Sequence, residues 1–543
     1  MKHSLFTLAL FLFAAGITCR AQLVQQWINF YHDTSWAYDG SAALDLDSSG
    51  NVFVGGWSGG IPDPNYNDYL IIKYTNSGSQ LWIASYDGTS GLDDKIYALK
   101  VTAGGDVIVT GSVFDGGGGW NLGTGKWSSA GALLWFNSYN GPFTAVYDQG
   151  NAIAIASDSS IYVCGVGENG AHHDLITAKY NPVTGARPWE VLYDGPGSLG
   201  EDLGRDIAVD ALGNIFVTGE SGATNTQTDY VTRKYNSSGV PQWTQRYNSS
   251  DSLTDVPVAL AIDGAGNTYV TGHSIIGSSG NFDCVTIKYD AAGNEAWATG
   301  YDTSNTAIVD DRGYDLTTDL DGNILIAARI LSSPPNSGWV IVKYDPNGNI
   351  LWSVLNNTVQ SGLPKKILTD QYGNVYIGGT ESHAATSDDF EILKYDSAGV
   401  FQWELIVDGD SSGDNLSDFT LDNAGNIYVT GKSFDVSLSN FIILTAKYSQ
   451  LLSVEQLQPI ISNLIYPNPA NENATIRFYG KSMTDYKLKI YDVPGREIFI
   501  MHGVTMIGKN EINIPTEHLL PGTYLINLEA GKESRSMKLI VSQ

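Results

Sequence analysis

A turn of the form Asp-x-x-Gly-Asn, followed by a short apolar strand that ends in Gly, recurs along most of the chain. Self-similarity at a period of roughly 40 to 55 residues is typical of β-propeller blades, in which one strand-rich unit is repeated around a ring. Many short strands also fit the 60 Gly and 30 Tyr of the composition. The eight copies begin at Asp47, Asp210, Asp263, Asp319, Asp370 and Asp422, with degenerate forms at Thr102 and around Asp158.

Two further features repeat in step with this turn, and together they predict how the ring closes. Eight strands end in Lys-Tyr or Lys-Trp, from Lys73-Tyr74 to Lys447-Tyr448, but only seven Trp-centred strands follow them, the last at Trp403. The missing eighth Trp strand lies at the other end of the chain, around Trp27. We therefore predict an all-β fold over residues 22–450: an eight-bladed propeller of four-stranded blades, whose N-terminal strand completes the last blade. A seven-bladed ring is the alternative.

The first 21 residues have the layout of a cleavable signal peptide. Lys2 precedes an apolar run from Leu5 to Ala15, and small residues lead to a cleavage point after Ala21. No later apolar run approaches the ~20 residues of a transmembrane helix. Only Cys164 and Cys284 then remain, and their separation argues against a disulfide framework. We expect an exported chain with two buried thiols and no transmembrane segment.

The charge of the chain excludes one class of partner. The net charge is −28, and nearly all the excess acid lies before residue 459. Binding to a phosphate backbone needs clustered cations, which the sequence lacks. We therefore expect no nucleic-acid partner, whereas cations and neutral surfaces such as glycans stay open.

The repeat resembles the SBBP family of bacterial β-propeller repeats. That family's pattern of Gly-Asn-x-Tyr-Val-Thr-Gly followed by Asp-Tyr-x-x-x-Lys-Tyr is matched well between Asn267 and Tyr289. The resemblance implies the propeller fold and an extracytoplasmic location. It implies no reaction, because the family shares none.

Residues 451–464 lack the repeat and are predicted to be a linker, and residues 465–543 contain short alternating strands typical of a small Ig-like β-sandwich. This segment resembles the type A C-terminal sorting domain of the type IX secretion system. The resemblance implies a Gram-negative bacterium, export to the periplasm followed by translocation to the outer surface or medium, and contact with the secretion machinery through residues 465–543. An accessory adhesive sandwich is the alternative. The matching residues are Tyr466, Pro467, Asn468, Pro469, Gly495, Pro521, Gly522, Tyr524 and Lys538.

Two series of aspartates follow the repeat and are expected on one face of the ring. The simplest hypothesis is that each carboxylate accepts hydrogen bonds from its own loop. The alternative is Ca²⁺ binding, since this ion takes about six to eight oxygen ligands. The first series, at the start of the innermost strands, is Asp39, Asp94, Asp148, Asp202, Asp255, Asp311 and Asp414, with Gly362 as the exception; the second, before Lys-Tyr, is Asp68, Asp174, Asp229, Asp283 and Asp389.

Five aromatic residues lie outside the repeating strand positions and are candidates for stacking on sugar rings. Packing between blades is the equally open alternative. They are Trp36, Trp57, Tyr66, Trp120 and Trp339.

These features favour a secreted or cell-surface binding module for a glycan or another extracellular macromolecule, with Ca²⁺ as a possible ligand and no other cofactor indicated. No catalytic residue is assigned, because no nucleophile elbow, zinc-binding helix or phosphate-binding loop occurs. One alternative is a secreted hydrolase or lyase that uses carboxylates of the propeller face on polysaccharide. Another is a purely structural surface protein.

Overall fold

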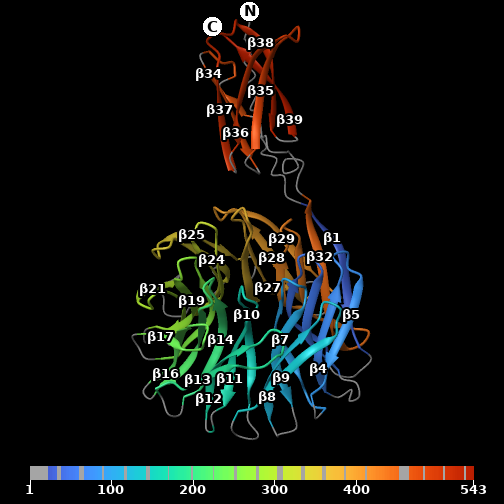
Figure 1. The fold of residues 1–543 in the computed structure, drawn as a ribbon, viewed down its shortest axis with the longest axis vertical. Helices are drawn as coiled ribbons and strands as arrows, with labels where there is room; N and C mark the ends of the chain where they lie inside the picture. Colours follow the sequence, from blue (N-terminus) through green and yellow to red (C-terminus); the bar gives the residue numbers. More distant parts are fainter. Residues whose placement is uncertain are drawn as a thin grey trace, which may run out of the picture. The chain divides into compact units, whose positions relative to one another are not determined.

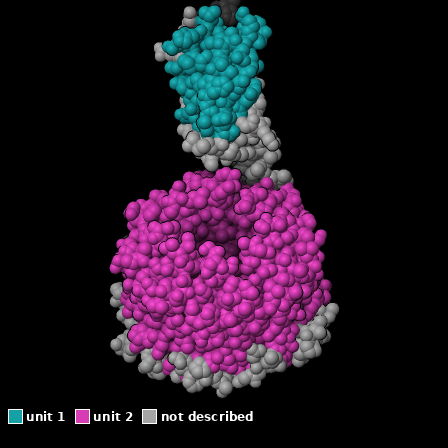
Figure 2. All heavy atoms as spheres, viewed as in Figure 1, with its two compact units in different colours: residues 1–22, 451–543 teal, residues 23–450 magenta. Residues whose placement is uncertain are grey.

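The computed structural model describes the chain as strands joined by short turns, in two compact units that extend from Leu23 to Gln450 and from Leu451 to the C-terminus (Figures 1 and 2). No helix long and apolar enough to cross a bilayer occurs in the described part. The described residues are 22–33, 38–59, 66–88, 91–114, 119–141, 147–168, 170, 172–196, 200–223, 226–249, 253–276, 281–301, 310–331, 337–357, 362–383, 387–409, 413–451, 464–466, 468–471, 473–480, 484–505, 508–530 and 533–542. The predicted signal peptide lies outside them.

The described residues of the first unit form eight four-stranded sheets, numbered 1 to 8 along the chain, and the unit is a multi-bladed β-propeller. The first strands of successive sheets contact one another around the ring, and sheet 8 returns to sheet 1 through β30 and β2. Figure 2 shows the central hollow. The first strands, which therefore lie innermost, are β2 (Gly40–Leu46), β6 (Lys95–Val101), β10 (Gln149–Ile155), β14 (Asp202–Val209), β18 (Asp255–Ile262), β22 (Asp310–Thr318), β26 (Leu363–Thr369) and β30 (Asn415–Leu421).

The second and third strands form the middle of each sheet and are almost entirely buried, as expected for short β-branched and aromatic runs packed on both faces. The second strands are β3 (Val52–Gly59), β7 (Val107–Phe114), β11 (Ile161–Glu168), β15 (Ile215–Ala223), β19 (Thr268–Ile275), β23 (Ile324–Leu331), β27 (Val375–His383) and β31 (Ile427–Asp435). The third are β4 (Asn67–Tyr74), β8 (Trp120–Trp127), β12 (His173–Tyr180), β16 (Thr226–Tyr235), β20 (Phe282–Tyr289), β24 (Gly338–Tyr344), β28 (Ser387–Tyr395) and β32 (Asn440–Leu451).

The fourth, Trp-centred strands alternate exposed and partly buried residues, as edge strands do. In sheet 8 this place is taken by the N-terminal strand β1 (Gln22–Tyr31), which lies next to β32 as predicted. The other seven are β5 (Gln80–Tyr86), β9 (Leu133–Tyr139), β13 (Trp189–Tyr193), β17 (Pro241–Tyr247), β21 (Glu295–Tyr301), β25 (Ile350–Asn356) and β29 (Phe401–Val407).

The repeated Trp and Lys side chains join each sheet to the next. In sheet 1, Trp82 Nε1 and Lys73 Nζ both donate to the carbonyl of Ser129, at 3.1 and 3.0 Å. That carbonyl belongs to the turn between the third and fourth strands of sheet 2. Equivalent pairs of donors meet at Pro182, Ser237, Pro346 and Ser397.

The same contact closes the ring. Trp27 of β1 and Lys447 of β32 both donate to the carbonyl of Asn76 in sheet 1, at 3.0 and 3.4 Å. The turn residue Gly78 has a φ of 88°, and a Cβ built on it would lie 2.5 Å from Trp27 Cγ. Glycine at this point therefore provides both the left-handed turn and the space for the indole.

The second unit forms a three-stranded sheet beside a four-stranded one, in the orders β33-β34-β37 and β36-β35-β38-β39. A separate core of Leu488, Ile490, Ile526 and Leu528 lies within it. This strand pattern fits the predicted Ig-like sandwich. Its strands are β33 (Leu464–Tyr466), β34 (Asn473–Gly480), β35 (Thr484–Asp492), β36 (Glu497–Thr505), β37 (Gly508–Pro515), β38 (Gly522–Ala530) and β39 (Glu533–Val541).

Replacement of Trp27 by Phe should lower the stability of the propeller by about 1 kcal/mol, the usual value of one hydrogen bond. The phenyl ring keeps the contact with Gly78 but cannot donate to Asn76. Trp243→Phe is the matched control, because Trp243 packs on Gly293 in the same way but its Nε1 has no hydrogen-bond acceptor among the described residues. Urea unfolding midpoints compare the two variants, and equal losses would contradict the role given to the indole donor.

Candidate functional site

The seven aspartates at the start of the innermost strands are fully buried, at 0 to 1% exposure. Their carboxylates bind backbone amides of the loop that arrives from the preceding sheet. Asp148 illustrates the geometry: Gly141 N donates to Oδ2 at 2.9 Å, and Glu168 N, at the end of β11, donates to Oδ1 at 2.7 Å. The same loop contact forms at Asp39, Asp94, Asp202, Asp255 and Asp414; the loop before Asp311 lies outside the described residues.

In sheet 7 Gly362 stands at the position of the aspartate, and the carboxylate comes instead from Glu381 of the neighbouring strand. Gly362 N donates to Glu381 Oε2 at 2.7 Å, and Glu381 is 1% exposed. Glu381 stands two residues after the strand glycine Gly379, where sheet 1 has Ser58, which donates to Asp39 at 2.6 Å. A carboxylate is therefore present at every one of these junctions, from either strand.

The two predicted series of aspartates converge at three junctions between sheets, each time with a third carboxylate that the sequence analysis missed. Within each cluster the ligand atoms lie within 4.8 Å of one another. The third members follow the last residue of a fourth strand and precede Gly, so the pair Asp-Gly directly after a Trp-centred strand was an available signal. The clusters are Asp68, Asp87 and Asp94; Asp174, Asp194 and Asp202; and Asp389, Asp408 and Asp414.

The other members of the second series have different surroundings. Asp229, which is buried, pairs with Arg246 Nη2 at 2.7 Å. Asp283 is half-buried in β20 and lies opposite Ser274. A further group of possible ligands consists of His32, Asp33 and Asp39, at the junction of sheets 8 and 1.

Crowding of buried carboxylates changes their ionisation. The pKa of Asp94 is raised to about 7, first by burial and then by the charges of Asp68 and Asp87, against two backbone hydrogen bonds that lower it. The pKa of Asp414 is also raised, mainly by burial. Asp414 lies in its cluster with buried Asp389 and exposed Asp408. Such groups favour either a bound proton or a cation.

The five candidate aromatic residues have different fates. Trp57 lies in β3 and is half-buried, and Tyr66 and Trp120 are 36% and 38% exposed. Trp120 Nε1 donates to the carbonyl of Asp93 at 3.0 Å. For Trp339 the structure agrees with the alternative of packing between blades. It lies in β24 at 1% exposure, because it packs on sheet 7 and donates to Gly362 O. Trp36 lies outside the described residues.

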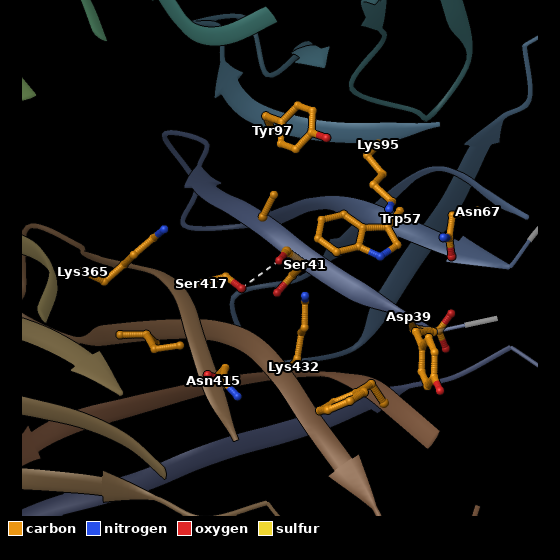
Figure 3. Close-up of a pocket in the computed structure, with 14 residues that line it drawn as sticks. Asp39, Ser41, Trp57, Asn67, Lys95, Tyr97, Lys365, Asn415, Ser417 and Lys432 are labelled. Carbon is orange, nitrogen blue, oxygen red and sulfur yellow. Dashed lines mark hydrogen bonds between the residues drawn. The ribbon is translucent and has the colours of Figure 1, made fainter. Parts of the chain in front are cut away.

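Trp57 lines a cavity of about 690 Å³ at the point where four innermost strands begin (Figure 3). Figure 3 shows its indole between Lys95 of β6 and Lys432 of β31, whose ammonium groups lie 5.7 and 4.7 Å from the ring centroid. The remaining walls combine aromatic, amide, hydroxyl and charged groups. They include Tyr38, Asp39, Ser41, Asn67, Tyr97, Lys365, Asn415, Ser417 and Phe441.

The residue at the position of Trp57 differs from sheet to sheet, although the residues on either side of it repeat. Trp57 is paired with Gly40, the residue after the buried aspartate, and this position can be followed through all eight sheets by register. Packing between sheets determines which residue types flank this position, namely Gly and apolar residues, whereas nothing in the repeat determines the residue at the position itself. The equivalent residues are Trp57, Ser112, Val166, Glu220, His273, Arg329, Thr380 and Lys432. The sequence analysis missed this variation, which aligning the repeats would have exposed.

The motif residues of the second unit hold its ends together. Asn468 Nδ2 donates to the carbonyl of Lys538 at 2.9 Å, and Asn468 Oδ1 accepts from Ile540 N at 2.8 Å, which ties this turn to β39. Tyr524 donates to the carbonyl of Leu520 at 2.7 Å, across exposed Pro521 and Gly522. Gly495 has a φ of 90° in the β35–β36 turn. Tyr466 lies in β33, Pro469 is exposed, and Pro467 lies outside the described residues.

Both cysteines of the propeller are free and buried, as expected.

A search of curated protein sequences found no match to this chain. Similar solved structures share 10 to 13% identity, and their TM-scores are below 0.5.

Three of these structures illustrate the range. Quinohemoprotein alcohol dehydrogenase from Comamonas testosteroni is 13% identical, with 78% of this chain and 76% of that chain covered and a TM-score of 0.46. Sqt1 from Chaetomium thermophilum is 12% identical, with 76% and 99% covered and a TM-score of 0.47. The polysaccharide lyase Uly1 is 10% identical, with 78% and 91% covered and a TM-score of 0.41.

The second unit gives a specific match. The family model of the secretion system C-terminal sorting domain matches residues 464–542. These residues include the turn at Asn468 and the last strand, β39, that it contacts. Such a domain belongs to proteins that the type IX system exports to the cell surface or beyond. Residues 464–542 of this chain are therefore a type IX secretion system C-terminal sorting domain.

Proposed function

We propose that the propeller is a secreted or cell-surface binding module, and that the cavity around Trp57 holds its ligand, a glycan. The observation that carries this proposal is the cavity itself, because it joins a half-buried indole to polar groups from four sheets. Indole rings stack on the apolar faces of sugars, while amides and hydroxyls bind sugar hydroxyls. The variation at the position of Trp57 supports the same interpretation, since the repeat does not require one residue type there.

The cavity favours binding over cleavage. A glycoside-cleaving pair needs two carboxyl groups roughly 5 to 10 Å apart that face the sugar. Asp39 is the one acidic residue among the described lining residues. Its carboxylate is buried and accepts hydrogen bonds from Ser58 Oγ and Asp33 N, and it also contacts His32 Nδ1. Asp39 is thus committed to the loop.

We also propose that the three aspartate clusters between sheets bind Ca²⁺. Each supplies three carboxylates within reach of one ion, and two of the three in every cluster are buried or nearly so. A hard cation with oxygen ligands would neutralise the charge that burial disfavours. The ion would then fasten neighbouring sheets. Water and backbone carbonyls would complete the six to eight ligands.

Export is assigned to the sorting domain, and we propose that the predicted signal peptide first carries the chain to the periplasm of a Gram-negative cell. Deletion of residues 464–543 should leave the propeller folded, because each unit has its own core. The truncated protein should accumulate inside the cell envelope, whereas the full chain reaches the surface or medium. Cell fractionation with an antibody to the propeller measures this; truncated protein in the medium would contradict the assignment.

Trp57→Ala should remove binding of the propeller to its glycan. The expected loss is roughly 5- to 150-fold in Kd, if a sugar face stacks as favourably as a nucleic-acid base, for which an aromatic ring contributes roughly 1 to 3 kcal/mol. An array of plant, algal and bacterial polysaccharides identifies the glycan, and titration calorimetry measures the loss. Trp120→Ala is the control, since Trp120 is exposed but lies outside this cavity. Binding to no polysaccharide, or equal losses in both variants, would contradict the proposed site.

Ca²⁺ should raise the unfolding temperature, and the rise should grow as the pH increases from about 5 to 8. The folded pKa of Asp94, about 7, lies above its ordinary value. Without metal, the folded state therefore keeps a proton that the unfolded state releases, and stability falls as the pH rises through this window. Ca²⁺ competes with that proton. At about 100 times its Kd it should add ~2.7 kcal/mol.

Asp194→Asn and Asp408→Asn should each reduce this rise, because each residue is the exposed member of its cluster. Asp321→Asn, in an exposed hairpin turn, should leave it unchanged. Scanning calorimetry in Ca²⁺ and in chelator measures the effect. Identical unfolding midpoints in Ca²⁺ and in chelator at pH 8 would contradict the metal site and mean that the carboxylates bind only the loops.

A further inference from the structure

We infer that the Trp57 cavity selects an anionic saccharide, one that carries a carboxylate or a sulfate. This inference rests on the proposed glycan site and adds the charge of the ligand. It runs against the composition of the chain, whose net charge is −28. The cavity is nevertheless lined by three lysines, Lys95, Lys365 and Lys432, against the single buried carboxylate of Asp39.

The three ammonium groups come from three different sheets. Lys95 begins β6 in sheet 2, Lys365 lies in β26 of sheet 7, and Lys432 lies in β31 of sheet 8. Sheet 1, between sheets 8 and 2, contributes Trp57. The lysines therefore surround the indole because the ring brings distant parts of the chain together. No local sequence pattern requires a cation at these positions.

Two of these cations have no acidic partner among the described residues. Lys95 Nζ lies 3.7 Å from Asp93 Oδ2. Lys365 and Lys432, in contrast, make no ion pair with any described acidic residue, although the structure contains many such pairs elsewhere. The pKa of Lys432 is lowered, first by burial and then by Lys95 and Lys365. A bound anion would relieve this repulsion.

The position of Lys432 is fixed by the residue beneath it. A Cβ built on Gly40 would lie 2.6 Å from Trp57 Cζ2 and 2.9 Å from Lys432 Cε. Glycine at this point of β2 lets the indole and the lysine stem lie together over the strand. The ammonium group therefore lies over the indole at the cavity, where both can contact one sugar residue.

The number of cations suits a short acidic glycan better than nucleic acid. Proteins that bind a phosphate backbone commonly make about 6 to 10 phosphate contacts. Three lysines within an acidic propeller match one or two charges, and the amide and hydroxyl groups of Asn67, Asn415 and Ser417 match sugar hydroxyls. The excess acid elsewhere repels long polyanions at low salt, since the Debye length is then longer.

The test compares acidic oligosaccharides with neutral ones of the same skeleton. Oligogalacturonate and its methyl ester provide the carboxylate arm, and κ-carrageenan oligomers and the same oligomers after desulfation provide the sulfate arm. Titration calorimetry on the full chain should give a Kd at least about tenfold lower for one acidic member than for its neutral match, a difference of 1.4 kcal/mol. The arm that responds identifies the anionic group.

Lys432→Met should weaken the acidic ligand about tenfold and leave its neutral match unchanged, because the thioether keeps the packing on Trp57 and loses only the charge. Lys432→Arg should retain most of the affinity. Lys100→Met is the matched control: it removes an equal charge from the same strand as Lys95, outside the cavity lining. Unchanged unfolding temperatures establish that each variant is folded.

Failure of the charge selection and failure of the proposed glycan site give different results. Equal binding of acidic and neutral oligomers, both lost in Trp57→Ala, would overturn the charge selection and leave the glycan site intact. Equal losses in Lys432→Met and Lys100→Met would also overturn it, as would equally tight binding of a duplex DNA or polyglutamate probe. Binding of no oligosaccharide in either arm or on the polysaccharide array would remove the proposed function and this inference together.

Discussion

At most junctions of the propeller, one sheet is joined to the next through a backbone carbonyl that accepts hydrogen bonds from an indole and an ammonium group. The indole and the ammonium come from one sheet and the carbonyl from the turn of the next. Because Trp27 and Lys447 make the same contact with Asn76, the last sheet is joined to the first in the way that most other sheets are joined, and the ring is closed. The Lys-Tyr, turn Gly and Trp elements of the repeat are thus parts of a single contact.

Closure of the ring determines what the remaining polar residues do. The inner-strand carboxylates bind the loops between sheets, and in sheet 7 Glu381 replaces the missing aspartate. Where a second and third carboxylate join them, burial and mutual repulsion raise their pKa and favour a cation. The position of Trp57 and its equivalents in the other sheets makes no such repeated contact. The residue there varies from sheet to sheet, and in sheet 1 it is Trp57, which lines a cavity together with three lysines.

The repeat was sufficient to predict the strands, their order in each sheet and the place of β1, because packing between sheets requires the same residues each time. The sorting domain was equally predictable from its ordered motifs. The site was not, because it combines single residues from four sheets. Asp87 was missed as a partner of Asp94. For Trp339 the sequence could not choose between sugar stacking and packing between blades, because the repeat does not show whether such an aromatic side chain turns inward. The acidic composition also concealed the cationic cavity, since Lys95 and Lys432 are 337 positions apart in the chain.

The proposed site requires that a ligand contact the ring at Trp57, and hydrogen exchange measured by mass spectrometry locates that contact. The propeller would be exchanged alone and with a saturating acidic oligosaccharide. Protection should be concentrated in the strands that line the cavity, chiefly β2, β3, β6, β26, β30 and β31, with sheets 4 to 6 unchanged. Protection centred on sheets 4 to 6, or spread evenly around the ring, would contradict a binding site at Trp57.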